Sequence, residues 1–294
     1  MRTLDRVLDG LMRRYRERVP AVAVILSAME AQGLADIEND HIAFRTLGVP
    51  NLGIRSFEKI FQHYSYQKRD AYHFESKKLD AFWYAPPEPR DPRIFVSELR
   101  VGELSLEAQQ IIESYTNEVI GDPVDGLDLD HGEAVDQFLH SALWRLPTWS
   151  DYSRLLVESE YAAWVIYNRY YLNHFTISIH SLPEPYNTVA GINVLVEKAG
   201  VKLNDSGGKI KTSPVSLLLQ SSTVAELVNA PFADGDWHQI AGSYVEFAER
   251  RVLPEFVGLS AAEIQRIHRR DGFEAANADR IFESTFTSQT GKRG

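Results

Sequence analysis

Two kinds of hydrophobic pattern alternate along the chain and predict its elements. Apolar residues recur at helical spacing in longer stretches, which predict helices at residues 3–32, 57–61, 103–169, 186–199 and 260–283. Apolar and polar residues alternate in shorter stretches, which predict strands at residues 40–46, 72–76, 78–84, 93–100, 173–180, 216–224 and 241–253. Short strands separated by turns in this way predict an α+β fold with one mostly antiparallel sheet.

The order of these predicted elements repeats along the chain. After residue 170 a strand is followed by a helix and then by further strands, and the same order is found loosely before residue 101. The helical stretch at about 103–169 separates the two. We therefore expect a single domain over residues 1–294, with a helical N-terminus, a helical insertion and two βαβββ-like halves that form a cupped sheet around a site.

The predicted strand at 173–180 carries candidate chemistry, because side chains alternate between the two faces of a strand. Its polar face includes two imidazoles and its other face is apolar; the polar residues are His174, Thr176, Ser178 and His180, and the apolar ones Phe175, Ile177 and Ile179. We expect the apolar face to pack on a core. The polar face lines either a cavity or open water, and this strand alone does not distinguish the two.

Two more predicted strands place metal-binding residue types on a polar face. His41 shares its face with Arg45, and Glu246 shares its face with Tyr244. Together with His174 these strands offer two imidazoles and one carboxylate. That is the ligand set of the facial triad in non-haem Fe(II) oxygenases, which leaves coordination positions open for substrate and O₂.

Composition and charge narrow the class of protein. The 294 residues are 44% hydrophobic and 24% charged, which is ordinary for a globular protein with a sizeable core. The formal net charge of -10 argues against a nucleic-acid-binding protein, which usually presents a basic face. The chain has no cysteine, so disulfides, thiolate metal sites and a cysteine nucleophile are excluded. A metal would have to be bound by His, Asp or Glu.

The sequence shows neither a secretory signal peptide nor an apolar run long enough for a membrane span. Charged residues follow Met1 at once and interrupt any apolar segment of a secretory signal peptide. Apolar runs also stay below the roughly 18 residues that a membrane span needs. We therefore expect a cytoplasmic protein without a membrane or nucleic-acid partner, and no pattern indicates its oligomeric state.

Eight stretches of the sequence carry a resemblance to a known family. They are DHIAFRT at 40–46, KKLDAFWYAPP at 77–87, PRIFVSEL at 92–99, NHFTISIH at 173–180, GGKIKTSP at 207–214, LLLQSSTVAE at 217–226, GSYVEFAER at 242–250 and GFEAANADRIFEST at 272–285. In this order they resemble the 2-oxoadipate dioxygenase/decarboxylase family. The resemblance implies a central sheet of the vicinal-oxygen-chelate type and a bound Fe(II) ion. It also implies the conversion of 2-oxoadipate and O₂ to D-2-hydroxyglutarate and CO₂, within lysine catabolism.

Carried over by this resemblance, the metal ligands are His41, His174 and Glu246, and Arg45 binds a substrate carboxylate. The implied cofactor is Fe²⁺, which another divalent metal can replace in a crystal, and the implied small-molecule partners are a 2-oxo acid and O₂. Arg45 would otherwise be paired with a protein carboxylate such as Asp40 or Glu246. Three more polar side chains are candidates for lining the substrate site: Gln220, Ser222 and Tyr244.

Other functions remain open at this stage. A lyase, isomerase or hydrolase could use the same ligands to hold Zn²⁺ and activate water, and a protein without catalytic activity could bind a small molecule there. A Ser/His/Asp hydrolase lacks its G-x-S-x-G motif. His180 lies about 20 Å along the strand from His174, so we expect it to form structural hydrogen bonds. The sequence defines neither the role of His238 nor the exact 2-oxo acid.

Overall fold

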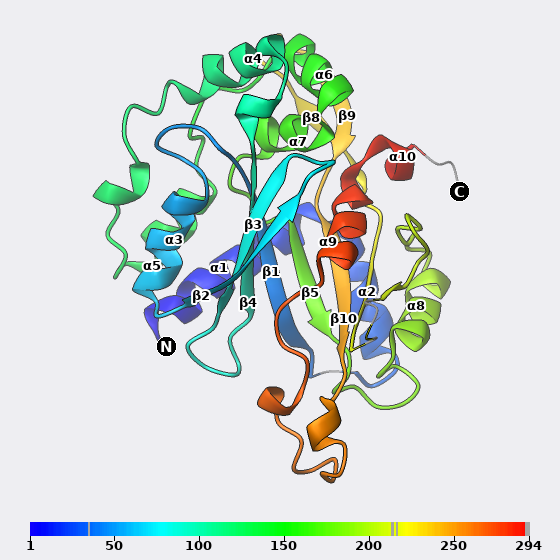
Figure 1. Ribbon diagram of the computed structural model, residues 1–294. Helices are drawn as coiled ribbons and strands as arrows, with labels where there is room; N and C mark the ends of the chain where they lie inside the picture. The colour runs from blue at the N-terminus through cyan, green and yellow to red at the C-terminus, as the bar shows by residue number, and fades with distance from the viewer. Residues whose placement is uncertain (35, 213–214, 216, 292–294) are drawn as a thin grey trace.

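The computed structural model describes residues 1–34, 36–212, 215 and 217–291 (Figure 1). The first half of its sheet is a strand, a helix and three more strands. These are β1 (Glu38–Leu47), α3 (Ile54–His63), β2 (Gln67–Phe74), β3 (Leu79–Ala85) and β4 (Arg93–Leu99). β2, β3 and β4 pair antiparallel in succession, and β4 then pairs in parallel with β1.

The second half repeats this topology. Its elements are β5 (His174–Ser178), α8 (Val189–Lys198), β6 (Lys211–Thr212), β7 (Leu218–Ser222) and β10 (Tyr244–Arg250). β6, β7 and β10 pair antiparallel in succession, and β10 pairs in parallel with β5. The two βαβββ-like halves predicted from the order of elements are therefore present.

The halves join through their first strands. β1 and β5 pair antiparallel at the centre, which gives an eight-stranded sheet in the order β2-β3-β4-β1-β5-β10-β7-β6. Only the pairs β1–β4 and β5–β10 are parallel among the described strands of this sheet. The predicted α+β fold with a mostly antiparallel main sheet is confirmed.

Helices precede the first half of the sheet and separate the two halves along the chain. The N-terminal pair is α1 (Thr3–Arg18) and α2 (Pro20–Glu30), and the helices of the predicted insertion are α4 (Leu106–Thr116), α5 (Gly132–Leu139), α6 (Trp149–Glu158) and α7 (Glu160–Asn168). Leu4, Val7 and Leu11 are buried at helical spacing on α1, and Pro20 begins α2 where its missing N–H costs nothing. Within the described ranges no helix has the length and hydropathy to cross a membrane.

The C-terminal part of the chain closes the concave face of the sheet. After the hairpin β8 (Leu227–Pro231) and β9 (Trp237–Ala241), the chain forms α9 (Ala275–Ile281) and α10 (Thr287–Thr290). The short helix α9, drawn in red in Figure 1, contacts both edge strands, β2 and β6, as well as β7. A single helix can reach both edges only because the sheet is strongly curved. The predicted cupped shape is therefore present, with α9 across its mouth.

Some element boundaries differ from the prediction. β2 begins at Gln67, before the predicted residue 72, because it is an edge strand whose first residues are exposed and polar and so lack alternation. The predicted helix at 260–283 is wrong over most of its length. Residues 268–270 instead extend along the end of β10, where an isolated bridge joins Val252 to Arg269. The start of the predicted strand at 216 and the end of the GGKIKTSP stretch at 213–214 lie outside the described residues.

Candidate metal centre

The candidate ligands stand on the three adjacent strands at the centre of the sheet. β5 is flanked by β1 and β10, and its residue Thr176 lies opposite both His41 and Glu246 in the pairing register. His174 is two positions along β5 on the same face and lies opposite Tyr244. The pairing therefore brings two imidazoles and one carboxylate to one point of the concave face, and all three side chains are buried.

The three side chains converge closely. Their candidate ligand atoms all lie within 4.8 Å of one another. Glu246 Oε2 is 3.2 Å from His174 Nε2 and 3.6 Å from His41 Nε2, and the Thr176 hydroxyl borders the triad at 3.0 Å from His41 Nε2. Ligands bound to one cation at about 2.0–2.2 Å lie about 3–3.5 Å apart. The donor set and its spacing fit a single divalent metal.

Each imidazole is held by the residue directly before it. β1 and β5 change register just before His41, so Asp40 is an extra residue in β1, and such a bulge redirects side chains. His41 Nδ1 donates to Asp40 Oδ1 at 2.8 Å, and His174 Nδ1 donates to Asn173 Oδ1 at 3.0 Å. With both Nδ1 atoms donating, the Nε2 atoms face the shared carboxylate. Histidines that ligate metals have this arrangement.

Asp40 is itself fixed by two buried arginines. Arg250 donates to both of its oxygens, from Nε at 2.6 Å and from Nη2 at 2.9 Å, and Arg93 Nη1 lies 3.3 Å from Oδ2. Burial alone would raise the pKa of Asp40, but the charges of Arg250 and Arg93 outweigh it and hold that pKa well below its usual range. Asp40 is therefore ionised at neutral pH and keeps a proton on the Nδ1 atom of His41.

The two histidines differ in their electrostatic surroundings. Burial opposes protonation of His41, yet the nearby carboxylates of Glu246 and Asp40 together raise its pKa. Burial lowers the pKa of His174 well below its usual range, and the charges of His41 and Arg45 act in the same direction. His174 is thus a neutral imidazole, while at His41 a metal would compete with a proton for Nε2.

The other oxygen of Glu246 is occupied by an amide. Gln220 Nε2 donates to Glu246 Oε1 at 2.5 Å, and Gln220 Oε1 accepts from Asn277 Nδ2 at 3.0 Å. Gln220 does border the cavity at the triad, as predicted for a substrate-lining residue. Both ends of its amide, however, form hydrogen bonds within the protein, and no sequence pattern indicates its link to Asn277.

Aromatic and aliphatic side chains from α9 and its flanks close the site. The cavity beside the triad is only about 20 Å³, and its apolar wall consists of Phe95, Phe273, Ala278, Ile281 and Phe282. The ring of Phe273 stands edge-on to His41 with 4.7 Å between centroids. Small-molecule sites usually measure about 300–1,000 Å³, so this arrangement is a closed one. The sequence did not identify these covering residues.

Arg45 lies on the same concave face and is fully buried. Its Nη1 donates to Thr285 Oγ1 at 2.9 Å and its Nη2 to the carbonyl of Phe282 at 3.0 Å. In the described part of the chain it makes no ion pair, so the alternative of pairing with Asp40 or Glu246 is not observed. Burial lowers the pKa of Arg45. A buried guanidinium without a carboxylate partner has the charge and geometry that suit an anion.

The hydroxyl of Tyr244 lies close to the guanidinium of Arg45, and the two groups interact electrostatically. The ring of Tyr244 stacks on His174 with 4.7 Å between centroids, and it borders the cavity as predicted. Its hydroxyl and the Nε atom of Arg45 are both buried without a hydrogen-bond partner among the described residues. Burial raises the pKa of Tyr244, so the hydroxyl stays protonated. Buried groups of this kind usually have hydrogen-bond partners. These two are near each other but keep hydrogen-bonding capacity that a polar ligand would use.

The remaining candidates lie outside this cluster. Ser222 does not border the cavity, because its hydroxyl is hydrogen-bonded to that of Ser284 at 2.9 Å. His180 lies near the hydroxyl of Ser178, at 3.3 Å, and accepts a backbone N–H of β10, which agrees with a structural role. The ring of His238 stacks on Trp149 with 3.7 Å between centroids and does not belong to the triad.

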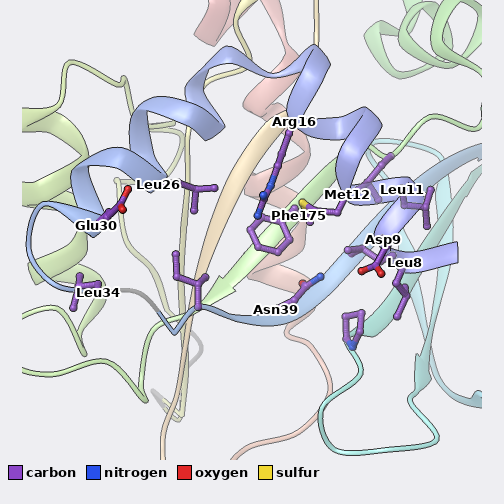
Figure 2. A pocket seen from close by; sticks show the side chains of 14 residues that line it. Leu8, Asp9, Leu11, Met12, Arg16, Leu26, Glu30, Leu34, Asn39 and Phe175 are labelled. Atoms are coloured by element: carbon purple, nitrogen blue, oxygen red, sulfur yellow. The ribbon is translucent and has the colours of Figure 1, made fainter. Parts of the chain in front are cut away.

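A larger cavity of about 510 Å³ lies on the opposite face of the sheet, beneath α1 and α2. Figure 2 shows Arg16 extending from α1 toward Phe175, a residue of the apolar face of β5. The walls are mostly aliphatic, and none of the lining residues is a histidine. This cavity therefore lacks the imidazole ligands that the triad offers to a metal.

The sequence of this chain is similar to that of a known family and of two curated proteins. The sequence model of a family described as 2-oxoadipate dioxygenase/decarboxylase matches residues 7–261. An Arabidopsis thaliana protein named 2-oxoadipate dioxygenase/decarboxylase, chloroplastic, is 40% identical over 299 residues, which cover 98% of this chain and 78% of that protein. A protein of Oryza sativa subsp. japonica, named 2-oxoadipate dioxygenase/decarboxylase, chloroplastic/amyloplastic, is 42% identical over 297 residues, which cover 98% and 80%.

A solved structure is similar over nearly the whole fold. It is the crystal structure of the hydroxyglutarate synthase from Oryza sativa in complex with 2-oxoadipate, with a TM-score of 0.90 and 41% sequence identity. The superposition covers 97% of this chain and 93% of that one.

The predicted cytoplasmic location is contradicted by these relatives. Both curated relatives are named as plastid proteins, one chloroplastic and the other chloroplastic or amyloplastic. The prediction rested on the lack of an apolar secretory segment. Such a segment marks secretion only, so its absence could not distinguish the cytoplasm from an organelle.

Proposed function

We propose that this chain, which belongs to the 2-oxoadipate dioxygenase/decarboxylase family, is an Fe(II)-dependent enzyme that converts 2-oxoadipate and O₂ to D-2-hydroxyglutarate and CO₂. One observation carries the proposal. His41, His174 and Glu246 converge on the concave face, on the same side of the sheet as Arg45, a buried arginine that has no carboxylate partner in the described ranges. Lysine catabolism, which the resemblance implied, is the setting proposed for this reaction.

The triad would hold the metal through two imidazole nitrogens and one carboxylate oxygen. This set suits Fe(II), Mn²⁺ or Zn²⁺, and iron is proposed because the family name describes use of O₂. Bound there, iron would supply the redox chemistry with O₂ and a Lewis acid for the 2-oxo carboxylate. Asp40 and Asn173 hold the two rings so that each presents Nε2 to the metal.

Arg45 would bind the carboxylate of the substrate that is remote from the metal. Its planar guanidinium can hold a carboxylate through two parallel hydrogen bonds. Phe282 and Thr285 accept hydrogen bonds from its Nη atoms, while its Nε and the Tyr244 hydroxyl have no hydrogen-bond partner among the described residues. The second carboxylate of a dicarboxylic substrate would neutralise the buried charge of Arg45. We therefore propose a dicarboxylic 2-oxo acid in preference to a monocarboxylic one.

The cover formed by α9 and its flanks would exclude water from the reaction. A six-carbon dicarboxylic acid does not fit a cavity of about 20 Å³, so Phe273 and Phe282 must move apart to admit it. Closure then surrounds the reacting atoms with apolar side chains. Electrostatic interactions between Arg45, the ligands and the substrate are stronger in such a water-excluded site.

The proposal is tested by reconstituting metal-free protein with Fe(II) under anaerobic conditions and then measuring O₂ uptake with a panel of 2-oxo acids. We expect uptake with 2-oxoadipate, and weaker uptake with monocarboxylic 2-oxo acids of the same length. Turnover that is independent of O₂ would instead support a metal-dependent lyase, isomerase or hydrolase. A protein that binds the acids without turnover would be a small-molecule-binding protein.

A further inference from the structure

We propose that Gln220 is a positioning residue that restricts Glu246 to a single metal-binding oxygen, and that Asn277 sets the orientation of Gln220. The inference rests on the proposed function, because it requires a metal at the triad. Gln220 and Asn277 are 2% and 1% exposed, so neither amide can exchange its partners for water. The chain of contacts runs from the backbone of β7 through α9 and back to the carboxylate on β10.

The orientation of each amide follows from its neighbours. Asn277 Nδ2 lies 3.1 Å from the backbone carbonyl of Leu218, and a carbonyl only accepts hydrogen bonds. Asn277 must therefore turn its NH₂ group toward Leu218 and also toward Gln220, at 3.0 Å. Gln220 must in turn present its oxygen to Asn277 and its NH₂ group to Glu246. The backbone carbonyl of Leu218, which can only accept, thus fixes the orientation of both side-chain amides.

This orientation determines how Glu246 can bind a metal. Its Oε1 accepts from Gln220, while its Oε2 faces both histidines, at 3.2 Å and 3.6 Å. An octahedral ion with three protein ligands has three positions left, which suffice for two oxygens of a 2-oxo acid and for O₂. If Glu246 used both oxygens, one of these positions would be lost. A substrate that chelates the metal would then leave no position for O₂.

The inference predicts a distinctive result for Gln220→Leu. Leucine removes the donor and frees Oε1, so the chain should still bind metal and 2-oxoadipate while O₂ uptake becomes slower. We expect kcat for O₂ uptake to fall about 10–100-fold, the usual effect of removing a group that orients a metal ligand, with a smaller change in KM for 2-oxoadipate. Co(II) alone, added to metal-free protein, should give a visible absorption spectrum different from that of the unaltered chain.

A second variant tests the same link from outside the cavity. In Asn277→Asp the carboxylate can no longer donate to Gln220, so the Gln220 amide should reverse and turn its oxygen toward Glu246. We expect the same loss of kcat and the same spectral change as in Gln220→Leu. Ser221→Ala is the matched control, because Ser221 is adjacent on β7 but donates to Asn193 at 2.6 Å. It should keep the Co(II) spectrum and kcat of the unaltered chain.

Thermal unfolding of each variant would show that the fold is retained. The inference is overturned if either folded variant keeps both the Co(II) spectrum and the kcat of the unaltered chain. It is also overturned if Ser221→Ala shows the same spectral change and loss of kcat. Failure of the unaltered chain to bind Co(II), or to consume O₂ with Fe(II), would instead contradict the proposed function, so the two failures are distinguishable.

Discussion

Replacing Asp40 by asparagine tests how the buried charges support the triad. Asp40 is 1% exposed and contacts both Arg250 and Arg93, which are 1% and 2% exposed. Asparagine has nearly the same shape but no charge, so two guanidiniums would share a buried site without their common carboxylate. Arg93 would keep Asp271, which is largely exposed, at 2.6 Å. Removing one partner of a buried ion pair costs about 3–5 kcal/mol, and we expect a loss of this size.

The same substitution should weaken metal binding. The side-chain oxygen of the asparagine can still accept a hydrogen bond from His41 Nδ1. Its NH₂ group would then face the guanidinium of Arg250, and two donors cannot form a hydrogen bond with each other. The opposite orientation places the NH₂ group against His41. Either arrangement disturbs the ring that presents Nε2, and loss of such support lowers metal affinity about 10–100-fold.

The assay combines urea unfolding of the metal-free chain with metal titration at pH 7. Asp136→Asn is the matched control, since Asp136 is also buried and contacts Arg14 and His140 on the α1–α5 side of the molecule. The control should lose stability but keep its metal affinity. An Asp40→Asn chain that unfolds within about 1 kcal/mol of the unaltered chain, or binds metal equally well, would refute the reasoning.

Two further predictions follow from single residues. Arg45→Lys should keep the metal content and raise KM for a dicarboxylic 2-oxo acid. Arg45→Ala should lower transition-state stabilisation, measured from kcat/KM, by about 2–5 kcal/mol. Equal losses with a monocarboxylic acid would contradict the proposed role of Arg45. Burial and the charge of Arg269 lower the pKa of His180 from 6.5 to about 4 in the folded chain. As the pH falls, His180 is therefore protonated in the unfolded chain before it is protonated in the folded chain. The free energy of unfolding should decrease between pH 6.5 and about 4, by up to about 3 kcal/mol, and His180→Asn should lack this contribution in urea unfolding at several pH values.

The strand face on which each candidate ligand lies was predictable because it depends on local alternation. His41, His174 and Glu246 each stand on the polar face of a short strand, and period-two patterns place such residues without knowledge of the fold. These strands are adjacent because the two repeated halves join through their first strands, β1 and β5, and because β10 pairs with β5 within the second half. The roles of the three residues and of Arg45 remain predictions, which the experiments above address.

Long-range and irregular features were not predictable in this way. The bulge that turns Asp40 toward His41 breaks the alternation from which strand faces are inferred. Asn277 reaches Gln220 across 57 residues of chain, and no periodic pattern encodes such a contact. The tail was predicted as helical over residues 260–283, whereas part of it is extended beside the residues that follow β10, and only α9 covers the site.

The stoichiometry of gas exchange tests the central claim most directly. Protein reconstituted with Fe(II) is supplied with 2-oxoadipate in a closed vessel without added 2-oxoglutarate, and consumed O₂, released CO₂ and 2-hydroxyglutarate are measured together. The proposed reaction predicts equal amounts of all three, and none of them when His174 is replaced by alanine. Release of CO₂ without O₂, or a requirement for added 2-oxoglutarate, would contradict it.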